Sequence, residues 1–227
     1  LNRALETRIL FGSYPEVINS PGNEKEVLNE LISDYLYKDI FALKDVRKPD
    51  ALDKLTKALA FQIGSQVSNR ELSQIAGIDK ETVDKYIYLL EEAYIIFRLG
   101  SYSKNLRNEL KFSQKIYFID TGLRNALINK FSPLSLREDT GSLWENYIIS
   151  ERRKKIEYER LNRNTWFWRT TRQQEIDYIE EDDDKISAFE FKWNTPKKIS
   201  MPKSFKNAYP DSEFQLITSE NYFEFLR

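Results

Sequence analysis

Three side chains near the C-terminal end of the sequence have types and a spacing that suit metal-assisted chemistry. Asp177 is followed, after a gap of twelve residues, by Glu190-Phe191-Lys192. Side chains alternate between the two faces of a strand, so Glu190 and Lys192 share one face of the strand expected over residues 186–193. A hairpin between the two segments would bring Asp177 beside them. Two carboxylates at adjacent strand positions form a hard oxygen site suited to Mg²⁺ or Mn²⁺.

The residue types that are absent from the sequence limit the reactions that such a site could catalyse. The sequence contains no cysteine and no histidine, which excludes disulfides, thiolate or imidazole metal sites, and Ser-His-Asp catalysis. A metal ion held by Asp177 and Glu190 could stabilise charge on a phosphodiester and lower the pKa of bound water. Lys192 could orient or activate that water. Glu145, on the helix expected before these strands, could complete the site.

The alternative for these four residues is a solvated strand face with an incidental ion pair. Asp followed by Glu-x-Lys is by itself common in charged strands. Two features favour a site: the order of the surrounding elements, and the position of Glu190 and Lys192 in the most apolar strand of the region. Buried charges cost free energy unless they are paired or bound to metal. We therefore expect site geometry here and treat cleavage activity as a separate hypothesis.

The elements expected around these residues follow the order helix, three strands, helix, strand. Periodicity and turn signals place them at residues 141–154, 165–169, 174–179, 186–193, 200–208 and 213–218. Trp166 and Trp168, at strand spacing, are expected in the core. The acidic run from Glu180 to Asp184 is expected to be a solvated hairpin turn rather than a site.

The middle of the chain has the pattern of a winged helix-turn-helix. A short helix over residues 70–75 is separated by a tight turn at Gly77 from a longer helix, residues 80–93, whose expected N-cap is Asp79. Strands at 93–99 and 115–118 follow, joined by a polar loop. Residues 101–116 have a net charge of +3, and the predicted DNA contacts there are Lys104, Arg107, Lys111 and Lys115.

The charges of the second helix leave the role of this motif open. Its start mixes acid and base, in Asp79, Lys80, Glu81, Asp84 and Lys85, whereas DNA phosphates favour Lys and Arg. The net charge of the whole chain is −1, so any nucleic-acid contact must come from a local basic patch. The sequence therefore leaves two roles open for this motif: DNA binding through the wing, and protein docking by the same fold.

Length and composition limit the classes of protein to which the chain can belong. The 227 residues, with 41% hydrophobic and 14% aromatic residues, are enough for real cores. No apolar run approaches the roughly 20 residues that span a bilayer, and the start has no secretory signal, so we expect no membrane partner and a cytoplasmic location. The first residue is Leu1 rather than methionine, from which we expect a piece of a longer protein.

A series of short segments resembles the prokaryotic ATPases that join an N-terminal AAA-type core to a C-terminal domain of unknown function. The order and spacing of the segments, rather than any one of them, carry the resemblance. In this sequence they are Gly12-Ser13-Tyr14-Pro15-Glu16-Val17, Tyr35-Leu36-Tyr37-Lys38-Asp39-Ile40, Tyr86-Ile87-Tyr88-Leu89-Leu90-Glu91, Ile116-Tyr117-Phe118-Ile119-Asp120-Thr121-Gly122-Leu123, residues 141–146, Trp168-Arg169, Glu175-Ile176-Asp177-Tyr178 and Ala188-Phe189-Glu190-Phe191-Lys192.

The resemblance implies a winged-helix middle and a C-terminal domain similar to the restriction-endonuclease-like, PD-(D/E)XK nucleases. On that comparison Asp177, Glu190 and Lys192 fall on the nuclease core motif, and Glu145 falls on the acid of the preceding helix. The chain has no G-x-x-x-x-G-K-[ST] loop, so ATP would bind only in a separate N-terminal core.

The prediction is thus an α+β multidomain chain. Residues 1–66 form a helical region, residues 67–135 a winged helix-turn-helix and connector, and residues 136–227 a nuclease-like α/β domain. The predicted function is the C-terminal portion of an ATPase, with a DNA-binding winged helix and a Mg²⁺- or Mn²⁺-dependent nuclease-like domain. The alternative is a non-catalytic module that docks DNA or protein and regulates the ATPase core. Nucleic acid and that core are the expected partners, and oligomerisation stays open.

Overall fold

The computed structural model describes the chain except for residues 1, 35–39, 41–45, 104–113 and 184. The chain divides into two compact units. Residues 1–98 with 115–138 form the first, which we call the helical unit, and residues 99–114 with 139–227 form the second, which we call the sheet unit. The predicted three-part division, with boundaries at 66 and 135, is finer and stays a prediction.

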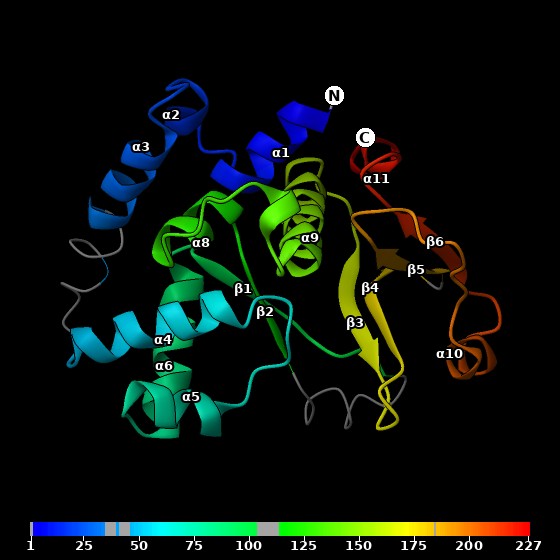
Figure 1. Ribbon diagram of the computed structural model, residues 1–227. Helices are drawn as coiled ribbons and strands as arrows, with labels where there is room; N and C mark the ends of the chain where they lie inside the picture. Colours follow the sequence, from blue (N-terminus) through cyan, green and yellow to red (C-terminus); the bar gives the residue numbers. More distant parts are fainter. Residues whose placement is uncertain (1, 35–39, 41–45, 104–113, 184) are drawn as a thin grey trace. The chain divides into compact units, whose positions relative to one another are not determined.

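The part of the chain up to residue 138 is mainly helical (Figure 1). Its elements are α1 (Asn2–Phe11), α2 (Pro15–Ile18), α3 (Glu24–Leu31), α4 (Pro49–Phe61), α5 (Asn69–Ala76), α6 (Lys80–Glu92), β1 (Ile96–Leu99), β2 (Lys115–Phe118), α8 (Thr121–Leu127) and the 3-10 helix η2 (Leu134–Leu136). Strands β1 and β2 form a two-stranded sheet. No helix in the described ranges has the length and apolar character needed to cross a membrane.

The helix-turn-helix pattern corresponds to α5, a turn and α6. Helix α5 ends at Gly77, whose φ of +67° is the left-handed conformation that glycine adopts without steric cost. The Asp79 carboxylate accepts a hydrogen bond from the Thr82 backbone N–H at 2.9 Å, which confirms Asp79 as the N-cap of α6. Hydrogen bonds from the Thr82 hydroxyl and backbone lower the pKa of Asp79. One face of α6 is buried through Val83, Tyr86, Ile87 and Leu90.

Asp120 connects the ends of α1 and α8. One carboxylate oxygen accepts from the Ser13 N–H at 2.7 Å, and the other caps α8 by accepting from the Leu123 N–H at 3.1 Å. Asn125 donates to the Leu10 carbonyl at 2.9 Å and so satisfies an otherwise unpaired C-terminal carbonyl of α1. Close approach is possible because Gly122 has no side chain: a Cβ there would overlap the Phe11 carbonyl.

Substituting Gly122 tests this junction. Gly122→Ala forces a methyl group onto the Phe11 backbone, so we expect a loss of at least about 2 kcal/mol of unfolding free energy. Gly141→Ala is the matched control, because nothing lies within 4 Å of a Cβ built at that exposed residue of α9 (Thr140–Tyr158). It should be neutral or stabilise by up to about 1 kcal/mol. Chemical unfolding monitored by circular dichroism measures both; equal stabilities would contradict the close approach.

The sheet unit has the element order that the sequence predicts. It runs α9 (Thr140–Tyr158), β3 (Asn164–Arg169), β4 (Glu175–Asp182), β5 (Lys185–Phe191), α10 (Lys203–Ala208) and β6 (Glu213–Ile217), followed by α11 (Tyr222–Leu226). The strand order is β3-β4-β5-β6 (Figure 1). Strands β3, β4 and β5 are antiparallel neighbours, whereas β6 is parallel to β5. The α+β class is confirmed; α11 was not predicted.

The two faces of this sheet bury different sets of side chains. One face carries a core that includes Trp168, Ile176 and Ala188 together with Phe205 of α10. Of the two tryptophans predicted to lie in the core, Trp168 is buried there, whereas Trp166 is partly buried and packs against it. On the other face Phe189 and Phe191 pack against Phe225 of α11, with ring centroids 4.7 and 5.7 Å apart. The alternation expected for β5 is thus observed.

The expectation that the whole acidic run is a solvated turn is wrong for Glu180. The turn itself is present between β4 and β5, but Glu180 lies within β4 and is 3% exposed. Arg152 of α9 binds both of its carboxylate oxygens, at 2.6 and 2.8 Å, and Arg163 binds one at 2.6 Å. A buried carboxylate is tolerated here because two arginines compensate its charge, a pairing between distant residues that charge patterning cannot reveal.

Candidate functional site

Strand β4 carries a bulge at Asp177. Trp166 pairs with Ile179 and Trp168 with Ile176, so the one residue of β3 between them faces two residues of β4. The regular pairing of β4 with β5 begins only at Tyr178. Such a bulge bends the strand and redirects side chains, and it explains why Ile176 and Ile179 share one core although they are three residues apart.

At the bulge, the Asp177 carboxylate, rather than a backbone carbonyl of β4, accepts a hydrogen bond from β5. Its Oδ2 accepts a hydrogen bond from the Phe191 backbone N–H at 2.9 Å. Beyond this point β5 continues to pair with β6: Phe191 lies opposite Ile217, and the Lys192 N–H donates to the Ile217 carbonyl at 3.0 Å. Both sides of the site are therefore fixed by backbone hydrogen bonds, which limits the freedom of the side chains that it carries.

The structure brings Asp177, Glu190 and Lys192 together. The Lys192 ammonium lies 2.6 Å from Glu190 Oε1 and 3.5 Å from Asp177 Oδ2. Asp177 is 7% exposed, so its charge is largely removed from water. Glu145 is half-buried on α9, and its charge contributes to raising the pKa of Lys192. Three of the four predicted residues thus meet at one place in the sheet unit, and Glu145 acts on Lys192 through its charge; their chemical roles stay predictions.

The cluster holds more negative charge than its single lysine compensates. Burial raises the pKa of Glu190, the charge of Asp177 raises it further, and Lys192 offsets only part of this. For Lys192 the effects run the other way. Burial acts to lower its pKa, but the charge of Asp177 and the hydrogen bond and charge of Glu190 outweigh burial, so the pKa is raised. An environment that penalises a carboxylate and favours a cation is one that attracts further positive charge.

The donor set fits a hard divalent cation in type. Asp177 and Glu190 offer carboxylate oxygens, and Mg²⁺ commonly uses one or two protein carboxylates while it keeps several waters. Within the described ranges, no group of three or more acidic, histidine or cysteine side chains lies close enough to hold a metal ion. Any metal site here therefore consists of this carboxylate pair completed by water or substrate oxygens.

Of the predicted DNA contacts, three lie outside the described residues: Lys104, Arg107 and Lys111. The fourth, Lys115, lies in β2 and is 2% exposed. Its backbone forms a β-bridge with Gln66. A side chain buried to this extent does not present its charge to a phosphate on the surface, so the burial argues against the predicted role of Lys115.

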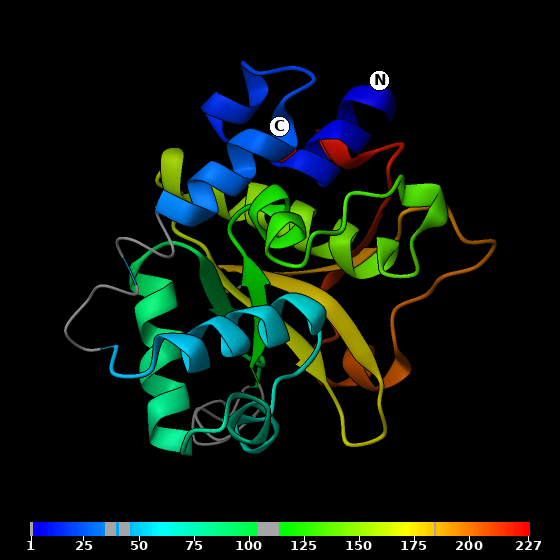
Figure 2. The same cartoon turned by 60° about the vertical axis from the view of Figure 1, so that its left-hand side comes forward.

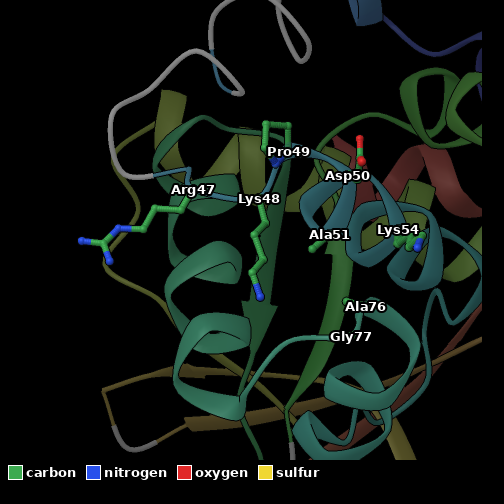
Figure 3. Close-up of a pocket in the computed structure, with 8 residues that line it drawn as sticks. All are labelled: Arg47, Lys48, Pro49, Asp50, Ala51, Lys54, Ala76 and Gly77. Atoms are coloured by element: carbon green, nitrogen blue, oxygen red, sulfur yellow. The ribbon is translucent and has the colours of Figure 1, made fainter.

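A pocket in the helical unit was not predicted from the sequence. It has a volume of about 380 Å³ and lies between the start of α4 and the turn after α5 (Figure 3). Its lining includes Arg47, Lys48 and Lys54, and Gly77 on the opposite side. The signal in the sequence is the basic pair directly before Pro49, the first residue of α4. Asp50 also lines the pocket, so three cations and one carboxylate surround it, beside the turn between α5 and α6.

The fold and the site together define a two-unit α+β protein whose sheet unit carries a carboxylate–lysine cluster. The chain belongs to the family described as a domain of unknown function, DUF8612, which matches residues 2–134. Residues 140–225 match a second domain of unknown function, DUF4143. That domain is found in C-terminal regions associated with AAA ATPases.

Several uncharacterized proteins are similar to most of the chain. One from Mycobacterium tuberculosis is 26% identical over 207 residues, which cover 89% of this chain and 45% of that protein. One from Methanocaldococcus jannaschii is 26% identical over 188 residues, covering 79% of this chain and 40% of that protein. The chain thus spans less than half the length of these relatives. No solved structure matches it.

The raised pKa of Glu190 predicts a pH-dependent effect of its neutral isostere. A carboxyl whose folded pKa is raised contributes stability below its unfolded pKa, and this is lost as the pH rises through the folded value. In EDTA, Glu190→Gln should therefore increase the melting temperature relative to wild type more at pH 8 than at pH 4.

The control is Glu157→Gln, which removes an exposed carboxylate paired with Arg153 and should change stability by less than about 0.5 kcal/mol. Differential scanning fluorimetry at the two pH values measures both variants. A Glu190→Gln variant that loses more stability at pH 8 than at pH 4 would show that ionised Glu190 stabilises the fold.

Proposed function

We propose that the sheet unit is a metal-dependent nuclease domain of a larger, ATPase-associated protein. The observation that supports this most is the position of the Lys192 ammonium between the carboxylates of Asp177 and Glu190, at the end of a central strand. The order of elements around the site and the resemblance of the segments that carry these residues to restriction-endonuclease-like proteins support the same proposal.

Each residue of the cluster has a role in this proposal. Asp177 and Glu190 would hold Mg²⁺ or Mn²⁺, which when bound supplies Lewis acidity and lowers the pKa of a coordinated water. Lys192 has three N–H donors and would orient the attacking water and the phosphate oxygen that it approaches. Glu145 acts on Lys192 through its charge and would keep the ammonium directed into the site. Attack of water on phosphorus breaks one P–O bond and releases the leaving oxygen as a hydroxyl group.

ATP chemistry would reside outside this chain. The second domain is of a kind found with AAA ATPases, and the relatives are more than twice as long as the segment they share with this chain. The sequence itself has no phosphate-binding G-x-x-x-x-G-K-[ST] loop. We infer that an ATPase core on the longer protein controls when the two units meet nucleic acid.

A second candidate function is a docking module without catalysis. The pocket lined by Arg47, Lys48 and Lys54, beside the turn between α5 and α6, favours it. Helices α5 and α6 with strands β1 and β2 would form a winged helix-turn-helix, and the pocket would receive a phosphate or an acidic side chain. On this proposal the cluster in the sheet unit would be a relic of a nuclease fold.

Cleavage assays separate the two functions. We expect the chain, and the longer protein that contains it, to cut duplex DNA or RNA when Mg²⁺ or Mn²⁺ is added and not in EDTA. Asp177→Asn and Lys192→Met should each lower the rate by at least about 100-fold, because each removes a group held at the reacting centre.

Lys185→Met is the matched control for the lysine substitution. Lys185 is exposed and paired with Glu213 at 3.0 Å in the same sheet, so its loss should leave the rate within about twofold. Cleavage that persists in Asp177→Asn, or that is absent from the wild-type longer protein with either metal, would leave the docking module as the better proposal.

A further inference from the structure

Two segments of the sheet unit carry basic side chains and no acidic ones. They are the last residue of β3 with the turn that leads to β4, residues 169–174, and the segment from residue 194 to 210 that contains α10. Two of their basic residues have local partners: Arg169 pairs with Glu175 at 3.4 Å, and Lys206 donates to the Ser212 carbonyl at 3.5 Å. The others are exposed, and the structure shows no ion pair or hydrogen bond of their side chains within the described residues. These four, which we call the basic rim, are Arg172, Lys197, Lys198 and Lys203.

Helix α10 and the turn after β3 lie side by side, although thirty residues separate their contacting residues in sequence (Figure 2). The Ser204 hydroxyl at the start of α10 donates a hydrogen bond to the Gln174 side-chain oxygen at the end of the turn. Beneath this contact, the Phe205 ring packs edge-on against Trp168 with centroids 5.1 Å apart. The core of the sheet unit therefore holds the start of α10, where Lys203 precedes Ser204, against the turn that carries Arg172.

The residues of the basic rim flank the carboxylate–lysine cluster in sequence. Arg172 precedes Asp177 by five residues, and Lys197 follows Lys192 by five residues. Five residues span at most about 18 Å even when fully extended. Half a turn of duplex DNA is about 17 Å long, so a duplex bound at the cluster is long enough to reach cations within this distance.

We propose that the basic rim binds the phosphate backbone of a nucleic-acid duplex and aligns it over the carboxylate–lysine cluster. Unpaired, exposed cations beside an acidic centre suit a polyanion whose scissile phosphate is brought to the centre by a metal ion. Single strands are usually gripped by exposed aromatic side chains that stack on bases. Here the aromatic residues of the two segments, Phe205 and Tyr209, are only 0% and 6% exposed. The surface therefore fits a duplex that is recognised through its phosphate backbone.

This inference deepens the proposed nuclease function, but binding tests it without cleavage. Fluorescence anisotropy in EDTA would measure the affinity of the chain for a 20-bp DNA duplex, roughly the length that covers a single domain footprint, at several salt concentrations. The rim variant combines Arg172→Gln, Lys197→Gln, Lys198→Gln and Lys203→Gln. Its affinity should fall at least about 10-fold, and its log–log salt slope should decrease by about 1 for each phosphate that the rim no longer neutralises.

The matched control removes the same charge from paired residues of the same unit. It combines Arg153→Gln, Lys154→Gln, Lys155→Gln and Lys185→Gln, each of which has an acidic partner within 4.0 Å. We expect its affinity to stay within about twofold of wild type, because the change in net charge is equal but the rim is intact. Melting temperatures verify that both variants fold.

The possible results test the proposed role of the basic rim separately from the proposed nuclease function. If the rim variant binds the duplex as tightly as wild type, the proposal that the basic rim binds phosphates is wrong, whatever the cleavage assay shows. A rim variant that loses binding in a protein that never cleaves supports the rim and refutes the nuclease. A single strand of equal length that binds as tightly as the duplex overturns the assignment to a duplex, and an RNA duplex run in parallel identifies the preferred sugar.

Discussion

The hydrogen bond from the Phe191 backbone N–H to the Asp177 carboxylate is the interaction on which the site depends. A carboxylate that is 7% exposed costs free energy unless it is bonded, and a strand N–H without an acceptor costs free energy as well. The bulge in β4 lets the two groups satisfy each other. As a result Asp177 is fixed at the start of the β4–β5 pairing, and Lys192 reaches it from the neighbouring strand.

Strand β4 contains two buried carboxylates in opposite electrostatic situations. Glu180 is compensated by Arg152 and Arg163, and Arg152 also donates to the Phe225 carbonyl, so this network ties α9 and α11 to the sheet. Asp177 shares one lysine with Glu190, whose pKa is raised. The first arrangement is complete within the protein. The second is short of positive charge, as expected of a site that receives a cation.

Each of the two units carries a surface with basic side chains. The first family match ends at residue 134, and the second begins at residue 140. The boundary between the two units, after residue 138, lies between these positions. The helical unit offers the pocket beside the turn between α5 and α6, and the sheet unit offers the basic rim and the cluster. In the functions proposed above, a longer protein with an ATPase core would use the first surface for docking and the second for chemistry.

The sequence by itself determined the element order of the sheet unit, the N-cap at Asp79 and the grouping of Glu190 with Lys192, because these depend on short-range periodicity and hydrogen bonding. Only the tertiary structure decided the bulge, the burial of Glu180 and Lys115, and the joining of the turn after β3 to α10. These depend on which distant residues meet: one side chain, such as Arg152, converts an apparently solvated acid into a buried ion pair. Long-range contacts of this kind leave no periodic signal in a single sequence, and they set the charge balance around Asp177.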